Sequence, residues 1–148
     1  MKLYAYLAAG AAALVAQTVY YPLALAVGAL EVTITGGTHV PHAPTVDYLT
    51  SVWLKTISRF GWQCSLTMDS AGYYPRGGGN LRLSIPGGTN AEPFDLTVRG
   101  RLEELRGVIT TTDLPDHVAE RGEKSLRQAM KNIGRSVETV RQSLPGPG

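Results

Sequence analysis

The chain has 148 residues, of which 43% are hydrophobic and 18% are charged, with a formal net charge of +2. That length suits one ordinary domain, or one small domain and part of another, and the apolar content is enough for a core. The net charge is too small to indicate a nucleic-acid binder by itself, although a pI of 8.8 leaves that class open. A single cysteine excludes an internal disulfide framework and a cysteine-based zinc site.

The first apolar stretch, residues 3–30, contains no charged side chain. Such a stretch is typical of a signal peptide or a membrane span. The break at Pro22 and the low hydrophobicity of the alanine run favour a buried helix instead, over residues 9–20, which Pro22 ends or kinks. Gln17 is the polar exception on that helix, and a lone amide in an apolar helix needs a hydrogen-bond partner or a polar cavity.

The next segments alternate between strand and helix patterns. Residues 31–35 are β-branched and alternate in polarity, which predicts a strand with one buried face. A helix is predicted over residues 45–60, beginning at Pro44 or Thr45 and ending at Gly61. Its apolar stripe has helical spacing and consists of Val46, Leu49, Trp53, Ile57 and Phe60.

Two further strand patterns, residues 62–68 and 80–85, flank a glycine-rich turn. The turn ends in three consecutive glycines, which permit positive φ angles and let a ligand approach the main chain closely. Arg76 lies at its lip, where a guanidinium can bind a phosphate through two hydrogen bonds. Arg76, Gly77 and Gly78 are therefore candidate phosphate- or RNA-binding residues. The simpler interpretation is a glycine-rich hairpin with a solvated arginine.

The second half of the chain has a different character. Residues 86–93 are rich in glycine and proline and predict a linker. Residues 94–112 are strand-like but charged, and Asp113 is expected to cap a helix over residues 115–133. A last strand is predicted over residues 136–143. A β-α-β segment of this size has a small core for independent stability.

Few side chains suggest catalytic chemistry. His39 and His42 lie two residues apart in a loop and lack a third metal ligand of obvious position, so plain loop histidines are the simpler interpretation. His117 is expected on the surface of a helix. The chain contains no Ser-His-Asp, Walker or dinucleotide-binding motif.

Several motifs nevertheless occur in a recognisable order. They are Gly36-Gly37-Thr38, Ala43-Pro44-Thr45-Val46-Asp47-Tyr48, the turn from Gly72 to Gly79, and His117-Val118-Ala119-Glu120-Arg121. In order and spacing the chain resembles the RNA 3'-terminal phosphate cyclases along nearly its whole length.

The resemblance implies an α/β (α+β) fold: a sheet-and-helix repeat domain over residues 1–88, followed by the start of a small insert domain over residues 94–148. Members of the family use ATP to adenylate a histidine, pass the AMP to an RNA 3'-phosphate and release a 2',3'-cyclic phosphate. Gln17 and Pro44 match positions that contact ATP in the family. The implied partners are ATP, an RNA with a 3'-phosphate end and a divalent metal ion such as Mg²⁺. The implied location is the cytoplasm, or the nucleus in a eukaryote, without membrane attachment.

The resemblance covers a middle portion of the family's sequence. Neither the N-terminal glycine-rich segment nor the region of the nucleophilic histidine has a counterpart, and none of the three histidines here matches that nucleophile. We therefore expect no cyclase activity from these 148 residues alone. One alternative is a non-catalytic cyclase-like protein that acts in RNA binding or ribosome biogenesis. Another, a secreted or membrane-anchored protein, rests on residues 3–30.

Overall fold

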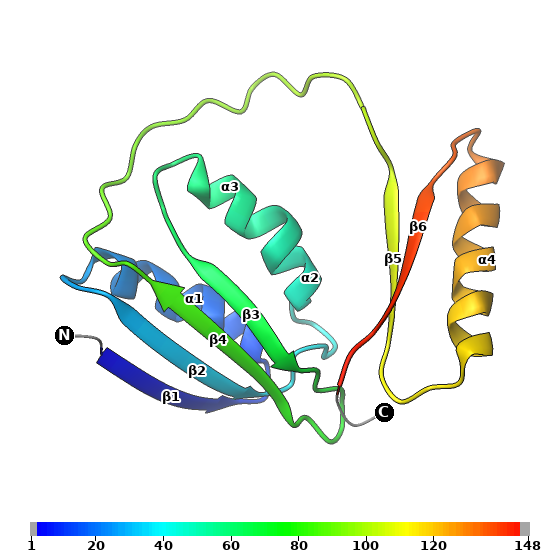
Figure 1. Ribbon diagram of the computed structural model, residues 1–148. Coiled ribbons are helices and arrows are strands. Elements are labelled where there is room, and N and C mark those ends of the chain that lie inside the picture. Colours follow the sequence, from blue (N-terminus) through cyan, green and yellow to red (C-terminus); the bar gives the residue numbers. More distant parts are fainter. Residues whose placement is uncertain (1–2, 146–148) are drawn as a thin grey trace. The chain divides into compact units, whose positions relative to one another are not determined.

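A computed structural model of the chain describes residues 3–145, with only the backbone described for residues 3–9. The chain divides into two compact units, which follow one another in sequence at Asp95 and Leu96. The first unit contains a four-stranded sheet and the second a two-stranded sheet (Figure 1). Helices and strands are mixed in both, which confirms the predicted α/β class. The predicted domains, residues 1–88 and 94–148, stay a prediction.

The sheet of the first unit has the strand order β1-β2-β4-β3. Its strands are β1 (Leu3–Ala9), β2 (Leu30–Gly36), β3 (Ser65–Ser70) and β4 (Gly79–Ile85). β1 and β2 are parallel, whereas β4 is antiparallel to both β2 and β3. Helix α1 (Ala12–Leu25) follows β1, and a second helix follows β2. This second helix consists of α2 (Val46–Tyr48), the π-helical turn η1 (Leu49–Trp53) and α3 (Leu54–Ser58).

Both helices cover the same face of this sheet. Alternate residues of β2 and β4 are buried and lie opposite one another, as the pairs Leu30–Ile85, Val32–Leu83 and Ile34–Leu81 show. They form one core with the alanines of α1 and with Val46, Leu49, Trp53 and Ile57 of the predicted stripe. Phe60, the last residue of that stripe, lies beyond the end of the helix and outside this core. The register therefore places the hydrophobic residues on one side of the sheet and leaves polar residues such as Thr33 and Arg82 on the other.

An aromatic cluster joins the two helices. Tyr20 is fully buried on α1, and its ring meets that of Trp53 edge to face with 5.2 Å between the centroids. The indole nitrogen of Trp53 donates a hydrogen bond to the Tyr21 hydroxyl over 3.2 Å. Because both helices follow the carboxyl ends of parallel strands, they begin at the same edge of the sheet and run in the same direction (Figure 1).

The structure changes the expected bounds of the first helix. Residues 3–9 form strand β1, and the helix begins only at Ala12. A parallel strand can read as an unbroken apolar run, so the sequence did not separate it from the helix. Pro22 lies inside α1, which continues to Leu25. Pro22 is exposed, so water can satisfy the carbonyl that loses its helical N–H partner. No helix among the described residues is long and apolar enough to cross a membrane.

The second unit is a β-α-β segment. Its elements are β5 (Arg106–Thr111), α4 (Asp116–Asn132) and β6 (Glu138–Ser143), and its two strands are parallel. The strand predicted over residues 94–112 is wrong for residues 94–105, because only the part that pairs with β6 is a strand. Asp113 does not cap the helix; it has a φ of 48° and precedes Pro115, which occupies the cap position.

Candidate functional site

The candidate site lies at the edge of the first sheet where β1 and β2 end and both helices begin. Two loops meet there: the one after β2 and the glycine-rich turn before β4. Thr38 joins them, because its hydroxyl oxygen accepts a hydrogen bond from the Gly72 N–H over 2.8 Å. The backbone N–H groups of Thr38 and His39 both donate to the Gly72 carbonyl, over 2.8 and 3.0 Å. Thr38 is only 1% exposed, so this joint is an internal part of the fold.

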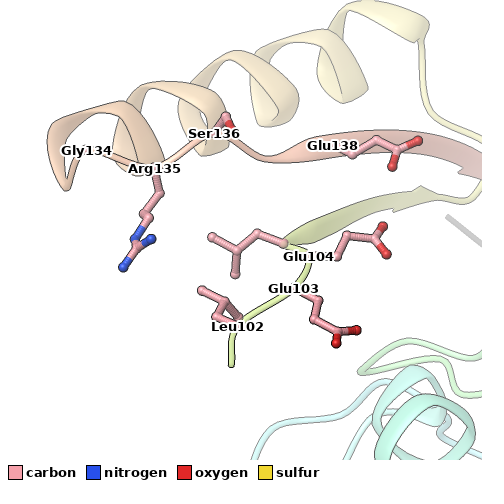
Figure 2. A pocket seen from close by; sticks show the side chains of 8 residues that line it. Leu102, Glu103, Glu104, Gly134, Arg135, Ser136 and Glu138 are labelled. Carbon is pink, nitrogen blue, oxygen red and sulfur yellow. The ribbon is translucent and has the colours of Figure 1, made fainter. Parts of the chain in front are cut away.

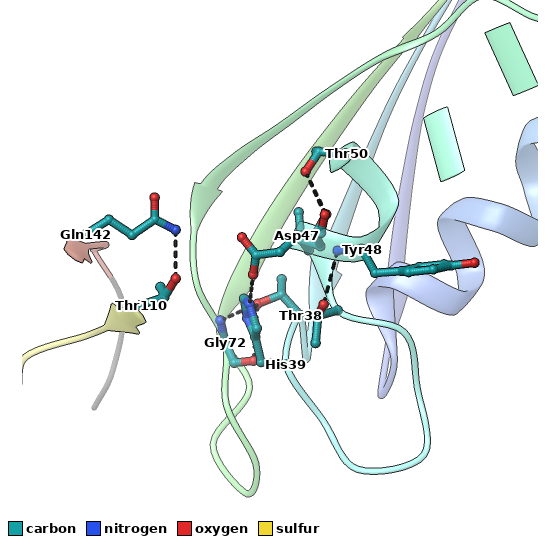
Figure 3. Close-up of polar contacts among 10 residues, drawn as sticks. Thr38, His39, Asp47, Tyr48, Thr50, Gly72, Thr110 and Gln142 are labelled. Atoms are coloured by element: carbon teal, nitrogen blue, oxygen red, sulfur yellow. Dashed lines mark hydrogen bonds and ion pairs between the residues drawn. The ribbon is translucent and has the colours of Figure 1, made fainter. Parts of the chain in front are cut away.

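A chain of polar contacts runs from Thr38 through His39 to Asp47 (Figure 3). The Thr38 hydroxyl lies 2.9 Å from Nδ1 of His39, and Nε2 lies 3.3 Å from the Asp47 carboxylate. A carboxylate only accepts hydrogen bonds, so Nε2 donates to Asp47. The Thr38 hydroxyl also lies 3.3 Å from the Gly72 carbonyl oxygen, to which it donates. Hydroxyl, imidazole and carboxylate thus stand in the order of a nucleophile triad. Burial of Thr38 keeps substrates away from that hydroxyl, so the chain of contacts positions the loop rather than performing an attack.

Tyr73 of the glycine-rich turn completes this cluster. Its ring is stacked on that of His39, with 4.9 Å between the centroids and 21° between the planes. Burial, together with the nearby Asp47 carboxylate, raises the pKa of the Tyr73 hydroxyl. The phenol therefore stays neutral. The loop after β2 and the turn before β4 are held together by this stack as well as by Thr38.

The glycines of the turn have two different roles. Gly72 and Gly79 are buried where two backbones touch; a Cβ on Gly79 would lie 2.8 Å from both the Gly36 carbonyl oxygen and the Gly72 nitrogen. Gly77 and Gly78 have φ angles of 66° and 78° and form the tip, next to the exposed Arg76. Packing explains the first two glycines. Only the tip keeps the phosphate-compatible character predicted for Arg76, Gly77 and Gly78.

The second helix begins as predicted, with Pro44 immediately before the cap. Thr45 is the cap residue, and its hydroxyl accepts a hydrogen bond from the Tyr48 N–H over 3.2 Å. Asp47 lies in the first turn, where a negative charge complements the helix dipole. The contact between His39 and Asp47 closes the loop that carries Pro44. Pro44 is half-buried, so it presents a fixed, partly accessible surface at the start of the helix.

Gln17 lies on α1, one turn before the Tyr21 hydroxyl that contacts Trp53. Its side chain is half-buried, and among the described residues it has no hydrogen-bond partner. Gln17 thus lies on α1, whereas Pro44 lies in the loop just before the neighbouring helix, and both helices start at one edge of the sheet. Binding by Gln17 and Pro44, and by the tip residues Arg76, Gly77 and Gly78, stays a prediction.

The cluster of Thr38, His39, Asp47 and Tyr73 was not predicted. His39 and Asp47 were each noticed, but they were treated as a loop histidine and a helix-dipole residue. The spacing of eight residues between them, around a proline-rich loop, was the one available signal. No three His, Cys, Asp or Glu side chains within the described part of the chain come together in a group that could hold a metal ion.

Comparison with known proteins identifies a consistent set of relatives. The sequence model of one family, described as RNA 3'-terminal phosphate cyclase, matches residues 3–139. A protein of that name from Nostoc punctiforme is 41% identical over 144 residues, which are 95% of this chain and 41% of the relative. The namesake from Methylococcus capsulatus is 42% identical over 127 residues, or 85% of this chain and 35% of the relative. The one from Archaeoglobus fulgidus is 38% identical over 141 residues, which are 93% of this chain and 41% of the relative. The chain thus spans less than half the length of these relatives.

Proposed function

Because the chain belongs to the RNA 3'-terminal phosphate cyclase family, we propose that its first unit supplies part of an ATP-binding site for such a cyclase. The reaction is the ATP-dependent conversion of an RNA 3'-phosphate end to a 2',3'-cyclic phosphate, which makes the whole protein a ligase. The chain covers 41% of its Nostoc relative, so the proposal concerns what these residues contribute to that reaction.

The observation that carries the proposal is the placement of Gln17 and Pro44. Both match ATP-contacting positions of the family: Gln17 lies on α1 and Pro44 immediately precedes the second helix, and the two helices begin at one edge of the sheet. Ligands of α/β proteins bind preferentially beyond the carboxyl ends of parallel strands, which is this edge. An amide without a partner on an apolar helix is well suited to hydrogen-bond a base or a ribose.

The other residues of the site have positioning roles in this proposal. The contact of His39 with Asp47 fixes the loop that carries Pro44, and the stack on Tyr73 fixes the turn that carries Arg76. The guanidinium of Arg76, with the backbone of Gly77 and Gly78, binds a phosphate of ATP or of the RNA end. ATP brings a Mg²⁺ ion that its own phosphates hold. The proposed location, which rests on the family resemblance, is the cytoplasm, or the nucleus in a eukaryote.

These 148 residues are not expected to form the covalent AMP adduct by themselves. Both ring nitrogens of His39 are engaged, by Thr38 and Asp47. Incubation of the chain with labelled ATP, followed by a denaturing gel, should show no labelled protein. A stable adduct on any histidine would contradict this part of the proposal.

Titration with ATP tests the site itself. We expect weak binding, with a Kd of about 1 mM or −4 kcal/mol. Gln17→Leu should weaken it by about 1 kcal/mol, roughly fivefold, because one hydrogen bond to the ligand is lost. The melting temperature should stay the same or rise, because the half-buried amide has no hydrogen-bond partner among the residues that the structure describes.

Thr18→Val is the matched control. Thr18 is exposed on the next position of α1, and its hydroxyl bonds only to the Leu14 carbonyl of its own helix, over 2.9 Å. This variant should bind ATP like the original chain. If Gln17→Leu left ATP affinity unchanged and lowered the melting temperature, Gln17 would be a structural residue. A chain that binds RNA but no ATP would favour the non-catalytic alternative.

A further inference from the structure

Helix α4 of the second unit separates its side chains into two faces. The inner line faces the strands and consists of Ala119, Glu123, Leu126 and Met130, all at least half-buried. The outer line, in contrast, is basic along its whole length. It consists of His117, Arg121, Lys124, Gln128 and Lys131, which recur at alternating spacings of four and three. Arg135 follows just beyond the end of the helix at Asn132, and all six residues are exposed. Four positive charges and no negative charge therefore lie along one stripe of this unit.

Two acidic residues near the stripe, Glu120 and Glu123, are already paired with arginines. Glu123 accepts hydrogen bonds from Thr139 over 2.7 Å, from Arg127 over 2.8 Å and from Arg141 over 2.6 Å. These bonds, that from Thr139 first, hold the pKa of Glu123 down to about 2. Glu120 lies 3.5 Å from Arg141. The charges of the outer line itself have no ion-pair partner among the described residues.

A hollow at the end of the stripe gathers cations. It has a volume of about 220 Å³ and is lined by Arg127, Lys131, Arg135, Ser136 and Val137. Arg127 is paired with Glu123, so Lys131 and Arg135 are the two cations of the hollow that have no ion-pair partner among the described residues. Together with the Ser136 hydroxyl they form a donor set suited to an anion. On the other side of Arg135 lies a second hollow with Glu103, Glu104 and Glu138. Figure 2 shows Arg135 pointing away from these three carboxylates.

We propose that the outer stripe of α4 binds the ribose-phosphate backbone of the RNA substrate, independently of base sequence and of the 3' end. The identity of the anion as RNA rests on the proposed function. A helix that binds a membrane surface needs a free apolar face, but the apolar face of α4 is packed on its own strands: Leu126, for example, contacts Gly107 of β5. His117 at the start of the stripe is its one aromatic ring, and the other five residues have none, so most of the contacts the stripe can make are with phosphates.

The test is fluorescence anisotropy with single-stranded RNA of about twelve nucleotides, ending in either a 3'-phosphate or a 3'-hydroxyl. The double variant K131Q/R135Q removes two cations of the hollow. It should bind roughly tenfold more weakly at about 50 mM salt, and its slope of log affinity against log salt should be shallower by about 1.4. Gln128→Lys, which adds a cation in the middle of the stripe, should bind more tightly. Both effects should be equal for the two RNA ends.

The control R99Q/R101Q loses the same charge from exposed, irregular backbone of the second unit and should bind like the original chain. Equal loss in both double variants would mean a general charge effect and would overturn the proposal, as would unchanged affinity of K131Q/R135Q. Loss of binding to anionic lipid vesicles but not to RNA would also overturn it. ATP titration of the same samples separates RNA binding by the stripe from ATP binding by the first unit. K131Q/R135Q should bind ATP like the original chain. If the original chain bound RNA but not ATP, only the proposed function would be contradicted.

Discussion

The two helices α1 and α4 show how differently the two units are built. α1 has 14 residues without a charged side chain and buries five of them. α4 has 17 residues, and Ala119 is the only one that the structure records as buried. The first unit is therefore stabilised mainly by apolar burial, which fixes the loops at the edge of its sheet. The second relies on a small core and on polar contacts around Glu123, and its outer surface is charged.

The largest effect should come from the core of the first unit. Trp53 is 9% exposed and contacts Tyr20 and Tyr21. Trp53→Ala should lower the free energy of unfolding by about 3–5 kcal/mol, because a large cavity replaces the indole. Urea denaturation followed by circular dichroism measures this loss. Val52→Ala, at a neighbouring position that is 48% exposed, is the control and should cost much less. An unchanged midpoint for Trp53→Ala would mean that the aromatic cluster does not hold the helices together.

A smaller effect is expected where the two loops of the site touch. Gly79→Ala would place a methyl group against the Gly36 carbonyl and the Gly72 nitrogen. We expect a cost of about 1–3 kcal/mol, because backbone at this joint cannot move away easily. Gly122→Ala in α4 is the control: its Cβ would meet only Ile109, at 3.6 Å, and alanine is the better helix former. Equal stability of the two variants in thermal melts would argue against the tight joint.

The smallest effect concerns the polar contacts of the second unit and depends on pH. The folded-state pKa of Glu123 is lowered from 4.5 to about 2, so ionised Glu123 stabilises this unit fully above pH 4.5. That contribution is lost as the pH falls toward 2. The stability gap between the original chain and Glu123→Gln should therefore be present at neutral pH and close over this range. Hydrogen exchange of the α4 amides measures it, and a gap that stayed constant with pH would contradict the assignment.

The sequence predicted the elements whose pattern is local. The stripe from Val46 to Ile57 defined the second helix, and Gly61, with a φ of 81°, follows its end. Strand β1 was missed because its partner is β2, some 27 residues away, and pairing across that distance leaves no local signal. The strand predicted before Arg106 is wrong because that segment has a strand-like pattern but does not pair with β6.

The candidate site divides in the same way. Gln17, Pro44 and Arg76 could be found because each stands in a short motif. The joint of Thr38 with Gly72 depends on 34 residues of intervening fold, and so does the stack of His39 on Tyr73. The sequence marked Gly72 and Gly79 as special positions. Glycine is required wherever either a ligand or a neighbouring backbone comes close, so the sequence could not tell which of the two is present. Only the structure distinguished between these two reasons.

The central claim is that the edge of the first sheet contacts ATP, and mapping of backbone amide signals during an ATP titration tests it most directly. In the ¹⁵N-labelled chain, we expect the backbone amide signals of three regions to shift as ATP is added: those around Gln17, those of Thr45 and Asp47 beside Pro44, and those from Arg76 to Gly78. Signals of α4 should remain in place, because the proposed ATP contacts all lie in the first unit. Shifts confined to α4, or no shifts at millimolar ATP, would show that the edge of the first sheet does not contact ATP.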